Sequence, residues 1–167
     1  MAVAAEISGR TAAFRSAFGG VVVWALMACG SAPPPPPPMP ATVAGSIEAS
    51  AQLNPSPSQR PSPMLLRIYE LKSATSFNGA DFMALYQADQ ATLGTEMVAR
   101  EEHTLRPGES RPYQKTLAAD TRFIAVFGAY RDLTRATWRA VVPVPAGQAH
   151  KLTIRAGELA LSATLTP

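Results

Sequence analysis

Proline limits where this chain can form regular structure, because its ring removes a backbone N–H donor and fixes φ. The chain has 16 prolines among 167 residues, and they are clustered rather than evenly spread. The clusters lie at 33–40, 55–63, 107–112 and 143–145. We therefore expect linkers or loops at these places, and strands or helices in the stretches between them.

The N-terminal part carries an uncharged apolar run at 17–28, AFGGVVVWALMA, preceded by Arg10 and Arg15. A membrane-spanning helix needs roughly 20 apolar residues, so this run is too short to span a bilayer comfortably and has the length of a signal-peptide core. The run ends in the letters LMAC, which include the only cysteine of the chain, Cys29. This ending resembles the bacterial lipobox.

The lipobox resemblance implies that Cys29 becomes the new N-terminus and carries a diacylglyceryl thioether and an N-acyl chain. Two or three acyl chains hold a protein durably on a membrane, at about 0.8 kcal/mol per buried methylene. Gly30 follows, not the aspartate that signals retention in the inner membrane. We therefore expect a lipid-anchored protein of the outer membrane that faces the periplasm. Two alternatives are an ordinary cleaved signal peptide with a chance cysteine, and an uncleaved anchor.

The chain therefore divides into a lipoprotein signal peptide (1–28), an acylated cysteine with a proline-rich linker (29–40) and a folded domain (41–167). Six consecutive prolines, Pro33 to Pro38, form most of the linker. A polyproline segment rises about 3.1 Å per residue, so these six residues would hold the domain roughly 20 Å from the bilayer. A ligand for a proline-recognition domain is the alternative reading of this segment.

Residues 41–167 favour a mainly β fold, because short stretches of alternating apolar and polar residues recur between turn signals. The expected strands are 43–53, 64–71, 96–105, 111–117, 121–130, 138–144, 151–155 and 158–165. Helical spacing appears only within 76–90, where Phe82, Leu85 and Tyr86 share one face. The stretch 121–130 is apolar on both faces, which indicates a central strand. This pattern predicts a two-sheet β-sandwich with a short helical insertion between its second and third strands.

Nucleic-acid binding and catalysis find little support in the sequence. The net charge is only +3, and basic residues are interleaved with acidic ones rather than clustered. His103 and His150 are the only histidines, which leaves no convincing zinc set. Glu101 and Glu102 are adjacent on an expected strand, so they point to opposite faces and cannot act as a close carboxylate pair. We expect no enzyme, no metal, no cofactor apart from the lipid, and no small-molecule substrate.

Several short motifs behind the lipobox resemble one family, the outer-membrane lipoprotein TssJ (SciN) of the type VI secretion system. The similarity extends to about Val142, and the last two strands are generic. In chain order the motifs are Arg60-Pro61-Ser62-Pro63, Leu65-x-Arg67-Ile68-Tyr69-x-Leu71, Phe77, Asp81-Phe82-x-x-Leu85-Tyr86 and Arg131-Asp132-Leu133-x-Arg135-Ala136-Thr137-Trp138-Arg139.

This resemblance implies a transthyretin-like β-sandwich that binds the periplasmic C-terminal domain of TssM. In this way it would tether the trans-envelope complex of TssJ, TssL and TssM. In the family, the loop between the first two strands is implicated in TssM contact. Here the corresponding residues are Asn54, Pro55, Ser56, Pro57, Ser58, Gln59, Arg60, Pro61, Ser62 and Pro63.

The composition of this loop is compatible with partner binding. A proline-rich loop has fewer conformations to lose on binding, and Arg60 is suited to a charge-assisted contact. The alternative is a plain connecting loop with a solvated Arg60. Asp132 is expected to start a surface turn and pair with a neighbouring arginine, and Tyr69 and Trp138 are expected in or beside the core.

Two broader alternatives for the protein remain open at this stage. One is a generic outer-membrane-anchored β-sandwich lipoprotein that acts as an assembly factor or adhesin. The other is a periplasmic small-molecule binder.

Overall fold

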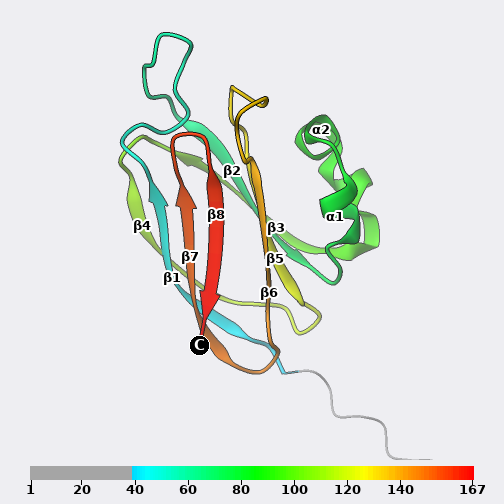
Figure 1. Cartoon of the computed structure of the whole chain (residues 1–167). Helices are drawn as coiled ribbons and strands as arrows, with labels where there is room; N and C mark the ends of the chain where they lie inside the picture. Colours follow the sequence, from blue (N-terminus) through cyan, green and yellow to red (C-terminus); the bar gives the residue numbers. More distant parts are fainter. Residues whose placement is uncertain (1–38) are drawn as a thin grey trace, which may run out of the picture. The chain divides into compact units, whose positions relative to one another are not determined.

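The computed structural model of the chain describes residues 39–167. The expected signal peptide, Cys29 and most of the proline linker lie outside the described residues. Two four-stranded sheets pack against each other, with two α-helices and a short 3₁₀ turn inserted between the second and third strands (Figure 1). The expected β-sandwich and the position of its helical insertion are therefore confirmed.

One sheet has the strand order β4-β1-β7-β8 and the other β3-β2-β5-β6. Strand β1 runs parallel to β7, whereas every other neighbouring pair is antiparallel. The strands are β1 (Thr42–Ala49), β2 (Met64–Leu71), β3 (Met97–Leu105), β4 (Ser110–Thr116), β5 (Phe123–Gly128), β6 (Arg139–Pro143), β7 (Ala149–Ala156) and β8 (Leu161–Thr166). The inserted elements are α1 (Thr75–Gly79), α2 (Phe82–Leu93) and the 3₁₀ turn η1 (Gly94–Glu96).

Several strands are shorter than the sequence pattern predicts, including β1, β5 and β8. The first was expected to reach Leu53, but β1 ends at Ala49, because the Leu53 N–H bonds to the Ser50 carbonyl and closes a turn. The last was expected from residue 158, but β8 begins at Leu161. There the Gly157 N–H bonds to the Ala160 carbonyl, so residues 157–160 form the connection between β7 and β8.

Two prolines lie within strands, at positions where the missing N–H of proline does not remove a hydrogen bond to a neighbouring strand. Pro143 is the last residue of β6. Pro112 lies within β4, in agreement with the expected strand 111–117, so the proline cluster at 107–112 does not fall wholly in a loop. Strand β4 is an edge strand, with a neighbour on one side only, and such a strand tolerates a missing N–H.

Strands β2 and β5 are buried on both faces, which confirms that the stretch 121–130 supplies a central strand. The side chains that face the other sheet include Leu66, Ile68, Ile124 and Val126. Those on the opposite face include Tyr69, Leu71, Ala125 and Phe127, and they pack against Phe77, Leu85 and Leu93 of the helices. The domain therefore has one apolar core between the sheets and a second core beneath the helical insertion.

The helical insertion, expected within 76–90, consists of two helices, α1 and α2, followed by the 3₁₀ turn η1. Asp81 caps the start of α2, where its side chain accepts a hydrogen bond from the Ala84 N–H at 2.8 Å. Helix α2 is interrupted at Ala88, whose φ of −141° and ψ of 39° are not helical. This interruption leaves carbonyl groups that need a donor from outside the helix.

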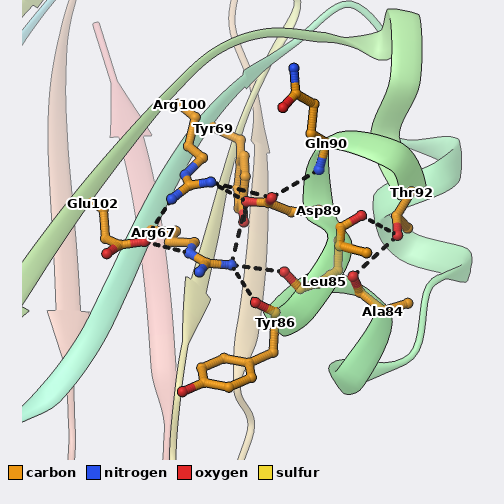
Figure 2. Close-up of polar contacts among 11 residues, drawn as sticks. Arg67, Tyr69, Ala84, Leu85, Tyr86, Asp89, Gln90, Thr92, Arg100 and Glu102 are labelled. Carbon is orange, nitrogen blue, oxygen red and sulfur yellow. Dashed lines mark hydrogen bonds and ion pairs between the residues drawn. The ribbon is translucent and has the colours of Figure 1, made fainter.

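Arg67 of β2 supplies that donor (Figure 2). Its Nη1 donates to the carbonyl oxygens of Leu85 at 2.9 Å and Tyr86 at 3.0 Å. Its Nε pairs with Glu102 of β3 at 2.8 Å. An arginine from the sheet therefore completes the first part of α2 while its charge is balanced by a carboxylate of the neighbouring strand.

Asp89, just after the interruption, points back to the sheet (Figure 2). It accepts a hydrogen bond from the Tyr69 hydroxyl at 2.9 Å and pairs with Arg100 at 3.1 Å and Arg67 at 3.4 Å. Burial, together with the hydrogen bond to Asp89, raises the pKa of Tyr69 above its ordinary value. These contacts fix the helical insertion to one face of the sheet.

Candidate functional site

The β1–β2 loop and the β5–β6 connection lie at the same end of the domain (Figure 1). The chain enters the domain at the other end, close to the C-terminus (Figure 1). The predicted partner-binding loop is therefore presented far from the point at which β1 begins.

Asn54 sets the conformation of the loop at its base. Its side chain is only 2% exposed, and its φ of 47° lies in the left-handed region, which asparagine tolerates better than most residues. The side-chain Nδ2 donates to the Pro63 carbonyl at 3.1 Å, and Oδ1 accepts from the Arg131 N–H at 2.8 Å. Asn54 thereby closes its own loop and attaches it to the β5–β6 connection.

The tip of the loop is closed by bonds around Ser56. The Ser56 N–H donates to the Arg60 carbonyl at 2.8 Å, and the Ser56 carbonyl accepts from the Gln59 N–H at 2.8 Å. The Ser56 hydroxyl oxygen also accepts from the Arg60 N–H at 3.2 Å. These bonds and the prolines on either side restrict the loop to few conformations.

The β5–β6 connection forms a compact turn at 131–135. The Asp132 carboxylate accepts from the Thr134 hydroxyl at 2.7 Å and from Arg135 Nε at 2.6 Å. These hydrogen bonds, that of Thr134 first, lower the pKa of Asp132 below its ordinary value. The expected turn at Asp132, paired with a neighbouring arginine, is confirmed.

A groove of about 480 Å³, which we call the loop groove, lies between these two segments. Its lining residues are Pro55, Ser56, Pro57, Gln59, Arg131, Asp132, Leu133, Thr134 and Arg135. Leu133 is 38% exposed and is one of the few large apolar side chains at the surface of the described residues. Arg131 also lines an adjacent hollow of about 330 Å³ together with Arg60.

The ten predicted loop residues fall into three groups by exposure. Asn54, Pro55 and Ser62 are buried; Asn54 and Ser62 support the loop, whereas Pro55 lines the loop groove. Ser56 is half-buried at the turn. The exposed residues are Pro57, Ser58, Gln59, Arg60, Pro61 and Pro63. The sequence pattern does not predict that residues 131–135 contribute to the groove, because a local pattern cannot link residues that are 77 positions apart.

The candidate catalytic and metal-ligating residues are not assembled into a site. Glu102 pairs with Arg67 beside the helices, whereas Glu101 pairs with Lys115 at 2.6 Å, so the two carboxylates do point to opposite faces. Within residues 39–167, no group of three or more His, Cys, Asp or Glu side chains is arranged to hold a metal ion. No helix in this part of the chain is long and apolar enough to cross a bilayer.

Comparison with protein families gives one match, over residues 41–159. The matching family is described as type VI secretion lipoprotein, with VasD, EvfM and TssJ among its names. The match extends beyond Val142, where the motif resemblance ended, and includes all of β7. Among curated proteins, none matches this sequence.

Three solved structures illustrate the similarity in fold. The type VI secretion lipoprotein TssJ1 from Pseudomonas aeruginosa is 41% identical, with a TM-score of 0.72 over 78% of this chain and 98% of that one. Serratia marcescens Lip, a membrane-bound component of the type VI secretion system, is 25% identical, with a TM-score of 0.68 over 74% and 96%. A chain in a structure described as the TssM C-terminal domain from EAEC is 26% identical, with a TM-score of 0.57 over 75% and 98%.

Proposed function

The chain belongs to the TssJ family of type VI secretion lipoproteins, and we propose that it tethers the trans-envelope complex to the outer membrane by binding the periplasmic C-terminal domain of TssM. The family is a structural component of the secretion machinery, so the chain is not an enzyme. TssL joins the same complex through TssM in this proposal.

The anchoring half of the proposal depends on Cys29. The apolar run, the LMAC ending and the prolines follow one another in the order expected of a lipoprotein signal peptide and its linker. The acyl chains on Cys29 hold the protein on the inner leaflet of the outer membrane, and the linker leads from this anchor to the domain.

The binding half of the proposal depends on the β1–β2 loop. The observation that carries it is the position of this loop, at the end of the domain opposite the entry of the chain (Figure 1). A partner reaching up from the inner membrane meets this end first. Because the loop is closed by its own hydrogen bonds, it loses little conformational freedom on binding.

The test is binding of the full-length chain, purified in detergent, to the periplasmic C-terminal region of the TssM encoded beside it. One variant replaces residues 57–61 with Gly and Ser at equal length, and it keeps Asn54, Ser56 and Ser62 so that the base of the loop still forms. A control variant replaces 146–148, in the β6–β7 connection at the other end of the domain, in the same way.

We expect the wild type and the control to bind and the loop variant to lose most of its affinity. Equal binding by all three would contradict the loop assignment and keep TssM as the partner. Absence of binding by folded wild-type protein would contradict the tether itself and favour a generic lipoprotein.

A further inference from the structure

We infer that the loop groove and the adjacent hollow receive an acidic segment of the partner, whose carboxylates pair with Arg60 and Arg131 and whose apolar side chain packs on Leu133. This inference rests on the proposed function, because the occupant is the protein that the β1–β2 loop binds. It adds the turn at 131–135 to the binding surface and defines the chemistry of the segment that is bound.

Charge is the first observation that points to an acidic occupant. Three arginines and one aspartate border the loop groove and the adjacent hollow. The aspartate, Asp132, is already paired with Arg135. Arg60 and Arg131 are exposed, and their side chains form no ion pair or hydrogen bond with any residue in the part of the chain that the structure describes.

Arg60 and Arg131 line the same hollow from two different loops. Two like charges that face one space repel each other, and an anion between them relieves this repulsion. A guanidinium group also matches the planar geometry of a carboxylate and can bind it through two parallel hydrogen bonds. The hollow is therefore complementary to a carboxylate side chain.

The apolar part of the groove is the second observation. Pro55 and Pro57 form one wall, and Leu133 of the opposite wall is 38% exposed. Most of the binding free energy at an interface comes from side chains that are buried in a pocket and surrounded by contacts that exclude water. The occupant therefore combines an apolar side chain with neighbouring carboxylates.

The third observation is that the two walls are already joined in the free protein. Asn54 holds the base of the β1–β2 loop to the backbone of Arg131 through its Oδ1 atom. The groove therefore exists before the partner arrives, which reduces the conformational freedom lost on binding.

The experiment measures the Kd of the full-length chain in detergent for the periplasmic C-terminal region of TssM, at low and at high ionic strength. The variants are Arg60→Glu, Arg131→Glu and Leu133→Ala. The control is Lys151→Glu, which makes the same change of charge at an exposed position of β7. The thermal unfolding midpoint of each variant is measured alongside.

We expect each arginine reversal to weaken binding roughly tenfold or more at low ionic strength, because a charge-assisted contact becomes a repulsive one. The difference in Kd between these variants and the wild type should be smaller at high ionic strength, where exposed charges are screened. Leu133→Ala should weaken binding severalfold with an unchanged dependence on salt. Lys151→Glu should stay within roughly twofold of the wild type, since its charge lies far from the groove.

If the wild type binds and both arginine variants bind equally well, the groove inference is overturned and the proposed function stands. The same conclusion follows if Lys151→Glu weakens binding as much as the arginine variants, because the effect is then one of net charge. If folded wild-type protein does not bind, the proposed function and this inference fall together.

Discussion

The side-chain oxygen of Asn54 accepts a hydrogen bond from the backbone N–H of Arg131 at 2.8 Å, across a separation of 77 residues. The amide nitrogen of the same side chain donates to the Pro63 carbonyl at 3.1 Å. One buried amide thus determines both the shape of the β1–β2 loop and its distance from the opposite wall of the groove.

Asn54→Asp tests this relationship. Aspartate keeps the acceptor for the Arg131 N–H and tolerates the positive φ, but it presents an acceptor to the Pro63 carbonyl in place of the donor. We expect the free energy of unfolding to fall by about 1–3 kcal/mol in urea titrations near pH 7. Asn78→Asp, the same change at an exposed residue of α1, should leave it nearly unchanged. Equal stability of the two variants would show that the Pro63 bond contributes little.

Arg67→Met tests the contact between the sheet and the kinked helix. The variant leaves the Leu85 and Tyr86 carbonyls without their donor and removes one of the two arginines that Asp89 contacts. Breaking a buried pair of this kind costs about 3–5 kcal/mol. Thermal and denaturant unfolding should show that loss for Arg67→Met. A much smaller loss is expected for Arg100→Met, because its side chain is 36% exposed.

Gly45→Ala tests the close approach of β1 to β7. A Cβ atom at Gly45 would lie 1.8 Å from the backbone oxygen of Leu152, so the two strands would have to separate. We expect the free energy of unfolding to fall by more than about 3 kcal/mol, or the variant to fail to fold, because the backbone cannot move aside as a flexible side chain can. Gly79→Ala has no atom within 4 Å of the new Cβ and should be tolerated. Soluble yield and unfolding midpoints separate the two outcomes.

Stability should fall in acid because of the ion pairs around Glu70. Burial alone would raise the pKa of Glu70, but hydrogen bonds from Lys115, the Ala118 N–H and Thr121 together lower it below its ordinary value of about 4.5. A carboxyl group whose pKa is lower in the folded state contributes stability above its unfolded pKa, and this contribution disappears as the pH falls through the folded pKa. Unfolding midpoints measured from about pH 6 to about pH 3 should therefore decrease.

Lys115→Met identifies the source of that dependence. At neutral pH the variant leaves Glu70 charged and without its cation, so the variant should be less stable than the wild type. The difference should narrow as the pH falls through the lowered folded-state pKa of Glu70, because Glu70 then becomes protonated in the wild type as well. Lys72→Met removes an exposed pair with Asp120 and should have little effect at any pH. A constant difference for Lys115→Met would point to lost packing rather than to charge.

Cys29→Ser tests the anchor. Without the thiol no thioether to diacylglycerol can form, so the variant should leave the outer-membrane fraction and fail to incorporate labelled palmitate. Fractionation and palmitate labelling of cells measure both effects, and secretion by the type VI system should fall with them. Ser31→Ala, close by in the sequence, serves as the control. Retention of Cys29→Ser in the outer membrane would contradict a lipid anchor at this residue.

The sequence determined the features that depend on residues close to one another along the chain. Alternating apolar residues predict strands, and a stretch that is apolar on both faces predicts the central strand β5, because strand side chains alternate between the two faces of a sheet. The prolines likewise predict the β1–β2 loop from local sequence alone. Asp132 predicts a turn, which it closes through hydrogen bonds from Thr134 and Arg135.

Only the tertiary structure decided which distant segments meet. Glu48 of β1 pairs with Arg155 of β7, 107 positions away, and Asn54 contacts Arg131 across 77. The interruption at Ala88 also needs Arg67 from another element to bind the freed carbonyls. Such contacts follow from how two sheets pack and which strands pair, and the free energy that selects this arrangement is shared among many residues. No single stretch of sequence determines this arrangement, so the loop groove could be identified only in the folded domain.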